Sequence, residues 1–197
     1  MTEKAKERAY TIAARSVGLL QSWFTPAQCK MVGQIADTIL TRLGYGGRVF
    51  VCGNGGCAAL AQHFAAECVG SFKDRNRPPW PVYALTADSA VTTAISNDYG
   101  QSKVFARQIE SLVGPQDILI CLSTSGTSAN VVEAAKLAKK ADCEVIAMVG
   151  THQSPLAEVA DQVLVFGPGP VPVVQEAFSM ACHIIVDLME LVWTSKR

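Results

Sequence analysis

The sequence has no excess of charge of either sign. It contains 17 Lys and Arg and 17 Asp and Glu in 197 residues, and only 17% of the chain is charged. Binding to the phosphate backbone of a nucleic acid usually needs a basic excess, so this balance disfavours a dedicated nucleic-acid-binding protein. Apolar residues make up 49% of the chain, which disfavours intrinsic disorder and supplies the core of one α/β domain.

Long apolar runs and paired cysteines are also missing. No run of about 18 uninterrupted apolar residues occurs, and residues 1–8 mix both charges without a following signal-peptide segment. The seven cysteines are odd in number and include no C-x-x-C pair. This pattern is typical of free thiols in a reducing compartment. We therefore expect a cytoplasmic protein with no membrane partner.

The first part of the chain is predicted to be helical. Apolar residues spaced three and four apart predict a helix over residues 2–24, and Pro26 marks the first turn of a second helix that reaches about Leu43. Both helices precede any predicted strand, so their apolar faces must be covered by the rest of the domain or by another subunit. We expect another subunit to cover at least the first.

The remainder alternates short apolar runs with helical segments. Strands are expected at 48–52, 82–85, 117–122, 144–149 and 162–166. Helices are expected at 57–69, 90–96, 103–112, 128–140, 155–160 and 171–194. Such alternation predicts a parallel sheet covered by helices on both faces. We expect one domain over residues 1–197, with residues 1–45 as helices that pack an oligomer and residues 46–197 as the α/β body.

A hydroxyl-rich loop follows the third predicted strand. Ser123-Thr124-Ser125-Gly126-Thr127-Ser128 offers five hydroxyls at the start of a helix, where unpaired N–H groups and the helix dipole favour an anion. Capping of the helix by Thr127 or Ser128 would explain only one hydroxyl. The loop therefore predicts a phosphate site.

A glycine loop follows the first predicted strand. Gly53-Asn54-Gly55-Gly56 lacks the G-x-G-x-x-G spacing, and no Walker-type Gly-Lys-Ser/Thr occurs, so dinucleotide and P-loop interpretations are weak. The glycines allow a backbone to approach a ligand closely, or simply form a tight turn. In a parallel sheet both loops should face one crevice beyond the carboxyl ends of the strands.

Two remote helices carry side chains that could hold a metal or transfer protons. His63 and Glu67 stand four residues apart and so share one helix face, although a solvated face is an alternative. Gln175, Glu176 and His183 interrupt an apolar helix, where a hydrogen-bonded core histidine is the alternative. Two His, one Glu and one Gln would form an N/O ligand set suited to zinc.

Two further polar segments have less specific signals. Asn97-Asp98-Tyr99-Gly100 indicates a turn or a helix stop, and its polar pair could also reach a sugar hydroxyl. Lys73, Arg75 and Arg77 lie beside prolines and indicate a solvated loop, with contact to a phosphate as the less favoured interpretation.

Taken together, these segments resemble a known family. The residues that carry the resemblance are 52–56, 61–67, 94–100, 123–126 and the pair 175–176 followed by His183. They resemble the sugar isomerase (SIS) fold and, within it, the phosphoheptose isomerases. The serine loop alone would identify only the broader SIS fold, and the resemblance extends over nearly the whole chain.

The resemblance implies a fold, a partner and an activity. The expected fold is a five-stranded parallel sheet flanked by helices in a flavodoxin-like, three-layer arrangement, assembled as a homotetramer with active sites between subunits. The expected reaction interconverts sedoheptulose 7-phosphate and D-glycero-D-manno-heptose 7-phosphate, the first committed step toward the heptose of bacterial lipopolysaccharide or related glycans.

The resemblance also implies roles for individual residues. One zinc per subunit would be held by His63, Glu67, Gln175 and His183. Glu67 and His183 would also be the catalytic acid/base pair, with Glu67 taking the carbon-bound proton. The implied substrate site comprises Asn54, Gly55, Gly56, Glu67, Asn97, Asp98, Ser123, Thr124, Ser125, Ser128 and Gln175.

The chain departs from the family pattern at four positions. Cys57, Ser71, Thr127 and Val174 stand where the family commonly has Ser, Arg, Asn and Arg. The loss of two arginines removes possible phosphate contacts and leaves an isomerase of another phosphosugar as an alternative. A third class consists of scaffolds with this fold that bind the bacterial replication initiator. Such scaffolds are expected to lack the catalytic Glu and His, so the presence of Glu67 and His183 favours the enzyme.

Overall fold

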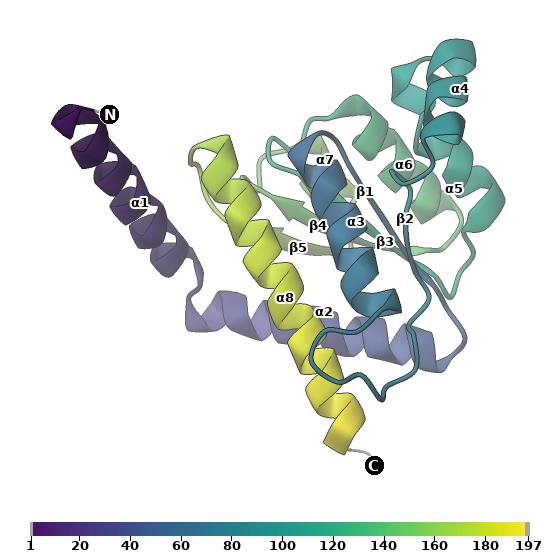
Figure 1. The fold of residues 1–197 in the computed structure, drawn as a ribbon. Coiled ribbons are helices and arrows are strands. Elements are labelled where there is room, and N and C mark those ends of the chain that lie inside the picture. Colours follow the sequence, from purple (N-terminus) through teal and green to yellow (C-terminus); the bar gives the residue numbers. More distant parts are fainter. Residues whose placement is uncertain (1, 196–197) are drawn as a thin grey trace.

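The computed structural model describes residues 2–195 (Figure 1). Its strands are β1 (Val49–Gly53), β2 (Val82–Ala84), β3 (Ile118–Ser123), β4 (Glu144–Val149) and β5 (Gln162–Val165). Its helices are α1 (Glu3–Trp23), α2 (Pro26–Gly44), α3 (Gly56–Val69), α4 (Ser89–Tyr99), α5 (Ala106–Leu112), α6 (Ala129–Lys140), α7 (Pro155–Val159) and α8 (Val171–Ser195).

The strands form one parallel sheet. Their order is β2-β1-β3-β4-β5, and β1 pairs with β3 in a register that sets Cys52 opposite Cys121. This order is the doubly wound arrangement of flavodoxin, in which the direction of strand addition reverses between β1 and β3. The expected five-stranded parallel sheet is confirmed. Ligands of such sheets bind outside the carboxyl ends of the strands where the order reverses, here β1 and β3.

Helices cover both faces of the sheet and create two cores. Successive residues of a strand point to opposite faces, so Val51 of β1 packs against α2, α3 and α8, whereas Phe50 and Cys52 pack against α4 to α7. In Figure 1, α3 and α8 lie side by side on one face. Both helices begin at the carboxyl edge of the sheet, where their strands or loops leave it.

Local sequence explains where α2 begins and where α4 begins and ends. Thr25 accepts a hydrogen bond from the Gln28 N–H and Pro26 occupies the first turn of α2, as a helix start requires. The expected helix over 90–96 is longer, because Asp88 caps α4 and the chain continues to Gly100, whose φ of 86° ends it. The expectation of one helix from 103 was wrong: a 3₁₀ turn over Gln101–Lys103 precedes α5.

The first two helices differ in how they pack. Helix α2 buries Val32, Ile35 and Ile39 against the domain, whereas α1 buries none of its residues. Figure 1 shows α1 extending away from the body. Tyr10 and Val17 of α1 are 77% and 62% exposed. Its apolar side chains therefore have little cover from this chain.

Helix α8 is the most apolar long helix of the described residues. By length and composition it passes the test for a membrane span, and it is the one described helix that does. In the structure it packs against α2 and α3, with Phe178, Ile185 and Met189 completely buried. This placement is that of a core helix.

Candidate active site

The loops after β1 and β3 meet at the predicted crevice. Asn54, directly after β1, and Asn130, in the first turn of α6, exchange two hydrogen bonds of 2.8 Å between their carboxamides. Asn130 is 4% exposed, so this pair anchors the glycine loop to the helix that follows the serine loop. The sequence does not single out Asn130, because one Asn at a helix start has many ordinary uses.

Hydroxyls of the serine loop face one another. The hydroxyl of buried Ser123 lies 3.2 Å from that of Ser128, and Thr127 donates to the Ser125 hydroxyl at 3.0 Å. Gly126, with a φ of 68°, makes the turn that brings them together. Ser128 occupies the N-cap position of α6, yet its side chain makes no capping hydrogen bond. Capping therefore does not explain the hydroxyls, and the start of α6 remains suited to an anion.

A cavity of about 250 Å³ lies next to this loop. Thr124 and Ser125 line one side, and Thr151, the turn 167–169 and Val174 line the other. These residues follow β3, β4 and β5 or begin α8, so the cavity lies at the carboxyl edge of the sheet. The cavity therefore adjoins the serine loop, where the sequence predicts the phosphate site, but the glycine loop does not line it.

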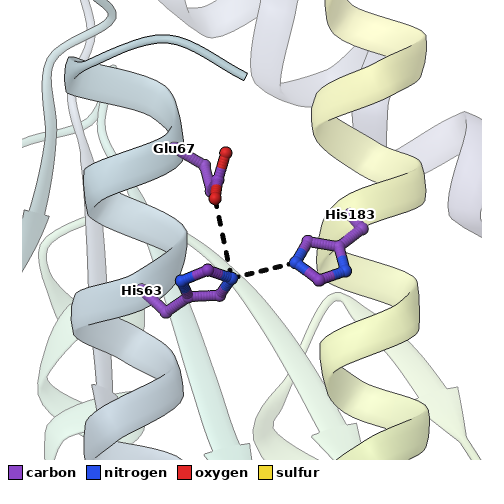
Figure 2. Close-up of side chains that lie close together, drawn as sticks. All are labelled: His63, Glu67 and His183. Carbon is purple, nitrogen blue, oxygen red and sulfur yellow. Dashed lines mark hydrogen bonds and ion pairs between the residues drawn. The ribbon is translucent and has the colours of Figure 1, made fainter. Parts of the chain in front are cut away.

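His63, Glu67 and His183 converge on one point between α3 and α8 (Figure 2). The Nε2 atoms of the two imidazoles are 2.9 Å apart, and Glu67 Oε1 lies 3.7 Å from His63 Nε2. His63 and Glu67 meet because they are four residues apart on α3, whereas His183 comes from 116 residues later in the chain. The His63 side chain is 46% exposed and that of Glu67 21%, so the cluster opens to the surface.

The three side chains fit a zinc ion in both chemistry and spacing. Their ligand atoms all lie within 4.8 Å of one another and comprise two imidazole nitrogens and one carboxylate oxygen. Zinc bonds of about 2.0–2.1 Å in tetrahedral geometry set neighbouring ligand atoms about 3.3 Å apart. The observed separations of 2.9 and 3.7 Å lie on either side of that value. Small side-chain rotations would therefore suffice to hold the metal.

Gln175 lies away from these three side chains within one chain. It lies eight residues before His183, which is about 12 Å along a helix axis. Its carboxamide instead lies over the start of α3, where a Cβ on Gly56 would come within 2.6 Å of Gln175 Oε1. Its Nε2 is 4.0 Å from the Cys57 sulfur. Burial raises the pKa of the Cys57 thiol, so this group remains protonated at neutral pH.

The remaining residues singled out in the sequence are exposed to solvent, with the exception of Arg77. Asn97 and Asp98 form the last turn of α4, where the Asn97 carboxamide donates to Asp98 at 2.8 Å and both face solvent. Lys73 and Arg75 are exposed as expected. The expectation of a solvated Arg77 was wrong: its side chain is 0% exposed, because it pairs with a buried carboxylate on α8.

The comparisons with known proteins agree with this geometry. A model of the SIS domain matches residues 14–150, so the fold and the site define a protein of the SIS domain class. The chain is 44% identical to the phosphoheptose isomerase of Geotalea uraniireducens over 81% of this chain and 84% of the relative. It is 42% identical to that of Synechocystis over 85% and 86%.

A solved structure gives the same result. The phosphoheptose isomerase of Neisseria gonorrhoeae superimposes with a TM-score of 0.85 at 34% identity, covering 94% of this chain and 98% of that one. This chain is a member of the phosphoheptose isomerase family, and the fold, the family resemblance and the enzyme class expected from the sequence are confirmed.

Proposed function

We propose that this isomerase interconverts sedoheptulose 7-phosphate and D-glycero-D-manno-heptose 7-phosphate with the help of one zinc ion per subunit. The observation that carries the proposal is the convergence of His63, Glu67 and His183 from two remote helices. The names of the relatives support a heptose phosphate as substrate.

The serine loop would hold the phosphate. Hydroxyls of Ser123, Ser125 and Ser128 gather at the start of α6, where the positive end of the helix dipole favours an anion. Thr124 and Ser125 also line the neighbouring cavity, which can admit the sugar. Asn54 and Gln175 lie at the start of α3, beside this loop, where polar contacts to sugar hydroxyls are available.

Glu67 and His183 would move the protons. Conversion of a ketose to an aldose needs a base that takes a proton from the carbon beside the carbonyl and an acid that shifts a proton between two oxygens. We assign the carbon-bound proton to Glu67 and the oxygen-bound proton to His183. Each side chain has a second polar atom, a carboxylate oxygen or Nδ1, so ligation through one atom leaves another for proton transfer.

His63, Glu67 and His183 would hold the zinc, and the family resemblance implies Gln175 as the fourth ligand. Because Gln175 of the same chain lies about 12 Å along α8 from His183, this ligand would come from a second copy of the chain. A bound zinc supplies Lewis acidity, which stabilises negative charge on a carbonyl oxygen. The imidazoles of His63 and His183 are already 2.9 Å apart, so α3 and α8 need no rearrangement to present them. In each imidazole the nitrogen that does not bind metal is free to accept or donate a hydrogen bond.

A second copy of the chain would complete the site, as expected for a homotetramer with active sites between subunits. The cluster opens to the surface, and exclusion of water from it needs a cover that residues 2–195 of this chain do not provide. The poorly covered side of α1 supports the same arrangement, since Val17, Leu20 and Phe24 line an apolar hollow of about 320 Å³ with Met180 of α8. We assign residues 1–45 to this packing.

The enzyme would act in the cytoplasm, in synthesis of the heptose of lipopolysaccharide or a related glycan. All seven cysteines are free thiols in the structure, and six of them are buried, which suits a reducing compartment.

A turnover assay against a panel of phosphorylated ketoses tests the proposed function. Purified protein is assayed with zinc, after chelation and after zinc is restored. We expect sedoheptulose 7-phosphate to give the highest kcat/KM, with activity lost on chelation and recovered with zinc. A higher kcat/KM for another phosphosugar would reassign the substrate. Full activity at sub-stoichiometric metal would remove zinc from the mechanism.

A further inference from the structure

A buried ion pair joins the segment after α3 to the end of α8. Arg77 Nε donates to Glu190 Oε1 at 2.8 Å, and their side chains are 0% and 5% exposed. The Arg77 guanidinium also lies over the Trp80 ring, 4.0 Å from its centroid. Burying an ion pair this deeply costs free energy unless every polar atom has a hydrogen-bond partner. The other partners of Arg77 and Glu190 therefore show which segments the pair connects.

Besides the neighbouring Pro78 carbonyl, to which Nη1 donates at 3.1 Å, Arg77 has its backbone partners at the end of α3. Its Nη1 donates to the carbonyl of Cys68 at 2.7 Å, and its Nη2 donates to the carbonyl of Glu67. Carbonyls in the last turn of a helix lack partners within the helix. Arg77 supplies those partners at Glu67, whose side chain belongs to the proposed catalytic cluster. The guanidinium thereby ties the backbone of Glu67 to α8 through Glu190.

The partners of Glu190 belong to the segment that follows α3. Its carboxylate accepts from the backbone N–H groups of Phe72 at 3.3 Å, Lys73 at 3.0 Å and Asp74 at 3.0 Å. This anchoring places the Phe72 ring against the His183 imidazole, with centroids 5.8 Å apart and an angle of 20° between the planes. His183 lies seven residues before Glu190 on α8. The same helix therefore carries both Glu190, which anchors the Phe72 segment, and His183, whose imidazole the Phe72 ring contacts.

Glu190 is ionised at neutral pH. Burial on its own would raise the pKa of this carboxyl, but hydrogen bonds from Arg77 and from three backbone N–H groups outweigh burial and hold the pKa below the usual value for glutamate. The charged form is therefore the one that collects these donors. A neutral amide at this position offers one acceptor oxygen in place of two and brings an N–H₂ group toward N–H donors.

We propose that Arg77 and Glu190, together with Phe72, form a positioning clamp that holds Glu67, His63 and His183 in the geometry needed for metal binding and proton transfer. The proposal rests on the function proposed above. Arg77 fixes the position of the end of α3, which carries Glu67. Glu190 holds the backbone of Phe72 so that the Phe72 ring packs against His183. Neither Arg77 nor Glu190 contacts the serine loop, which lies beyond the opposite end of α3. The clamp therefore acts on catalysis and metal binding but not on recognition of the phosphate.

Zinc affinity and steady-state kinetics of three variants test the clamp. Glu190→Gln weakens the clamp, Phe72→Leu removes the ring but keeps the backbone N–H, and Asp117→Asn is the matched control. Asp117 is also a buried carboxylate that accepts from an arginine, Arg48, and from backbone N–H groups, but it lies at the turn between α5 and β3. Loss of groups that orient metal ligands typically weakens metal binding or activity by about 10–100-fold.

We expect Glu190→Gln and Phe72→Leu to weaken zinc binding by at least about tenfold and to lower kcat, while KM for the phosphosugar stays within about twofold. Asp117→Asn should lower the melting temperature without changing zinc affinity. Measurements are made on full-length protein at a temperature where all variants are folded. Wild-type zinc affinity and wild-type kcat in folded Glu190→Gln would overturn the proposal. So would equal losses in Asp117→Asn, because a general effect of destabilisation would then explain them.

Imidazole signals in NMR spectra provide a readout that needs neither zinc nor activity. The chain has three histidines, and His183→Ala identifies the signals of His183. Stacking on Phe72 should move these signals upfield, and both Phe72→Leu and Glu190→Gln should reverse the shift. If the wild-type chain binds no zinc, the proposed role of the metal is wrong. The imidazole signals and kcat of the variants then test the clamp on their own. Unchanged His183 signals in Glu190→Gln would overturn it.

Discussion

Replacement of Glu67 by Gln gives the sharpest test of the proposed chemistry. Gln has nearly the same size and retains an oxygen beside His63 Nε2, where Glu67 Oε1 now lies at 3.7 Å, but it cannot accept a proton from carbon. A positioned general base contributes about 10²–10⁴-fold to the rate, or about 2.7–5.4 kcal/mol of activation free energy. We expect kcat to fall by this factor at saturating zinc. Glu67 lies eleven residues beyond Gly56, about 16 Å along α3, so KM should change little.

Exchange with deuterated water separates the two proposed roles. A base that takes the carbon-bound proton returns deuterium to that carbon, so Glu67→Gln should abolish incorporation, whereas His183→Ala should lower turnover and retain some exchange. Glu133→Gln is the matched control, because Glu133 is a surface carboxylate on α6 paired with Lys103. A kcat for Glu67→Gln within about threefold of wild type would refute its role as base. Exchange that is lost only in His183→Ala would reverse the assignment.

Two further predictions concern the phosphate loop and the oligomer. Ser125→Ala removes the hydroxyl that accepts from Thr127 beside the cavity, so KM for the phosphosugar should rise about tenfold with kcat nearly unchanged; an unchanged KM would exclude this hydroxyl from binding the phosphate. Val17→Glu places a charge on the exposed apolar side of α1, so light scattering should detect dissociation of the oligomer; a tetramer as stable as the wild type would exclude this surface from the interface.

Local pattern was sufficient to predict most of the fold. The predicted strand at 144–149 coincides with β4, because a continuous apolar run between polar residues marks a buried parallel strand. The region from 96 to 106 was predicted less well. There the choice between an α-helix and a 3₁₀ turn depends on the left-handed conformation of Gly100 and on how Val104 and Phe105 pack into the core, and neither is visible in local periodicity.

Site residues could be predicted where their spacing in the sequence, or a motif shared with the family, indicates a role. His63 and Glu67 have the four-residue spacing of a helix face, and His183 interrupts an apolar helix; the resemblance to the family then assigned these residues their roles. Arg77 and Glu190 carry no such signal. A basic residue directly before two prolines is typical of a solvated loop, and one Glu near the end of an apolar helix is typical of a surface position. Each becomes informative only when the fold brings it to the other, 113 residues away in the sequence.

Three polar residues of α8 lie along its contact with α3. Gln175, His183 and Glu190 follow one another at intervals of eight and seven residues, which keeps all three on the side of α8 that faces α3. Gln175 meets the start of α3, His183 meets His63 in its middle, and Glu190 meets the segment after its end. Apolar contacts between two helices tolerate small sliding movements, but the directional contacts of His183 and Glu190 and the close fit of Gln175 over Gly56 do not. Register between α3 and α8, and with it the distance from the serine loop to the proposed catalytic cluster, is therefore set by polar side chains within an otherwise apolar interface.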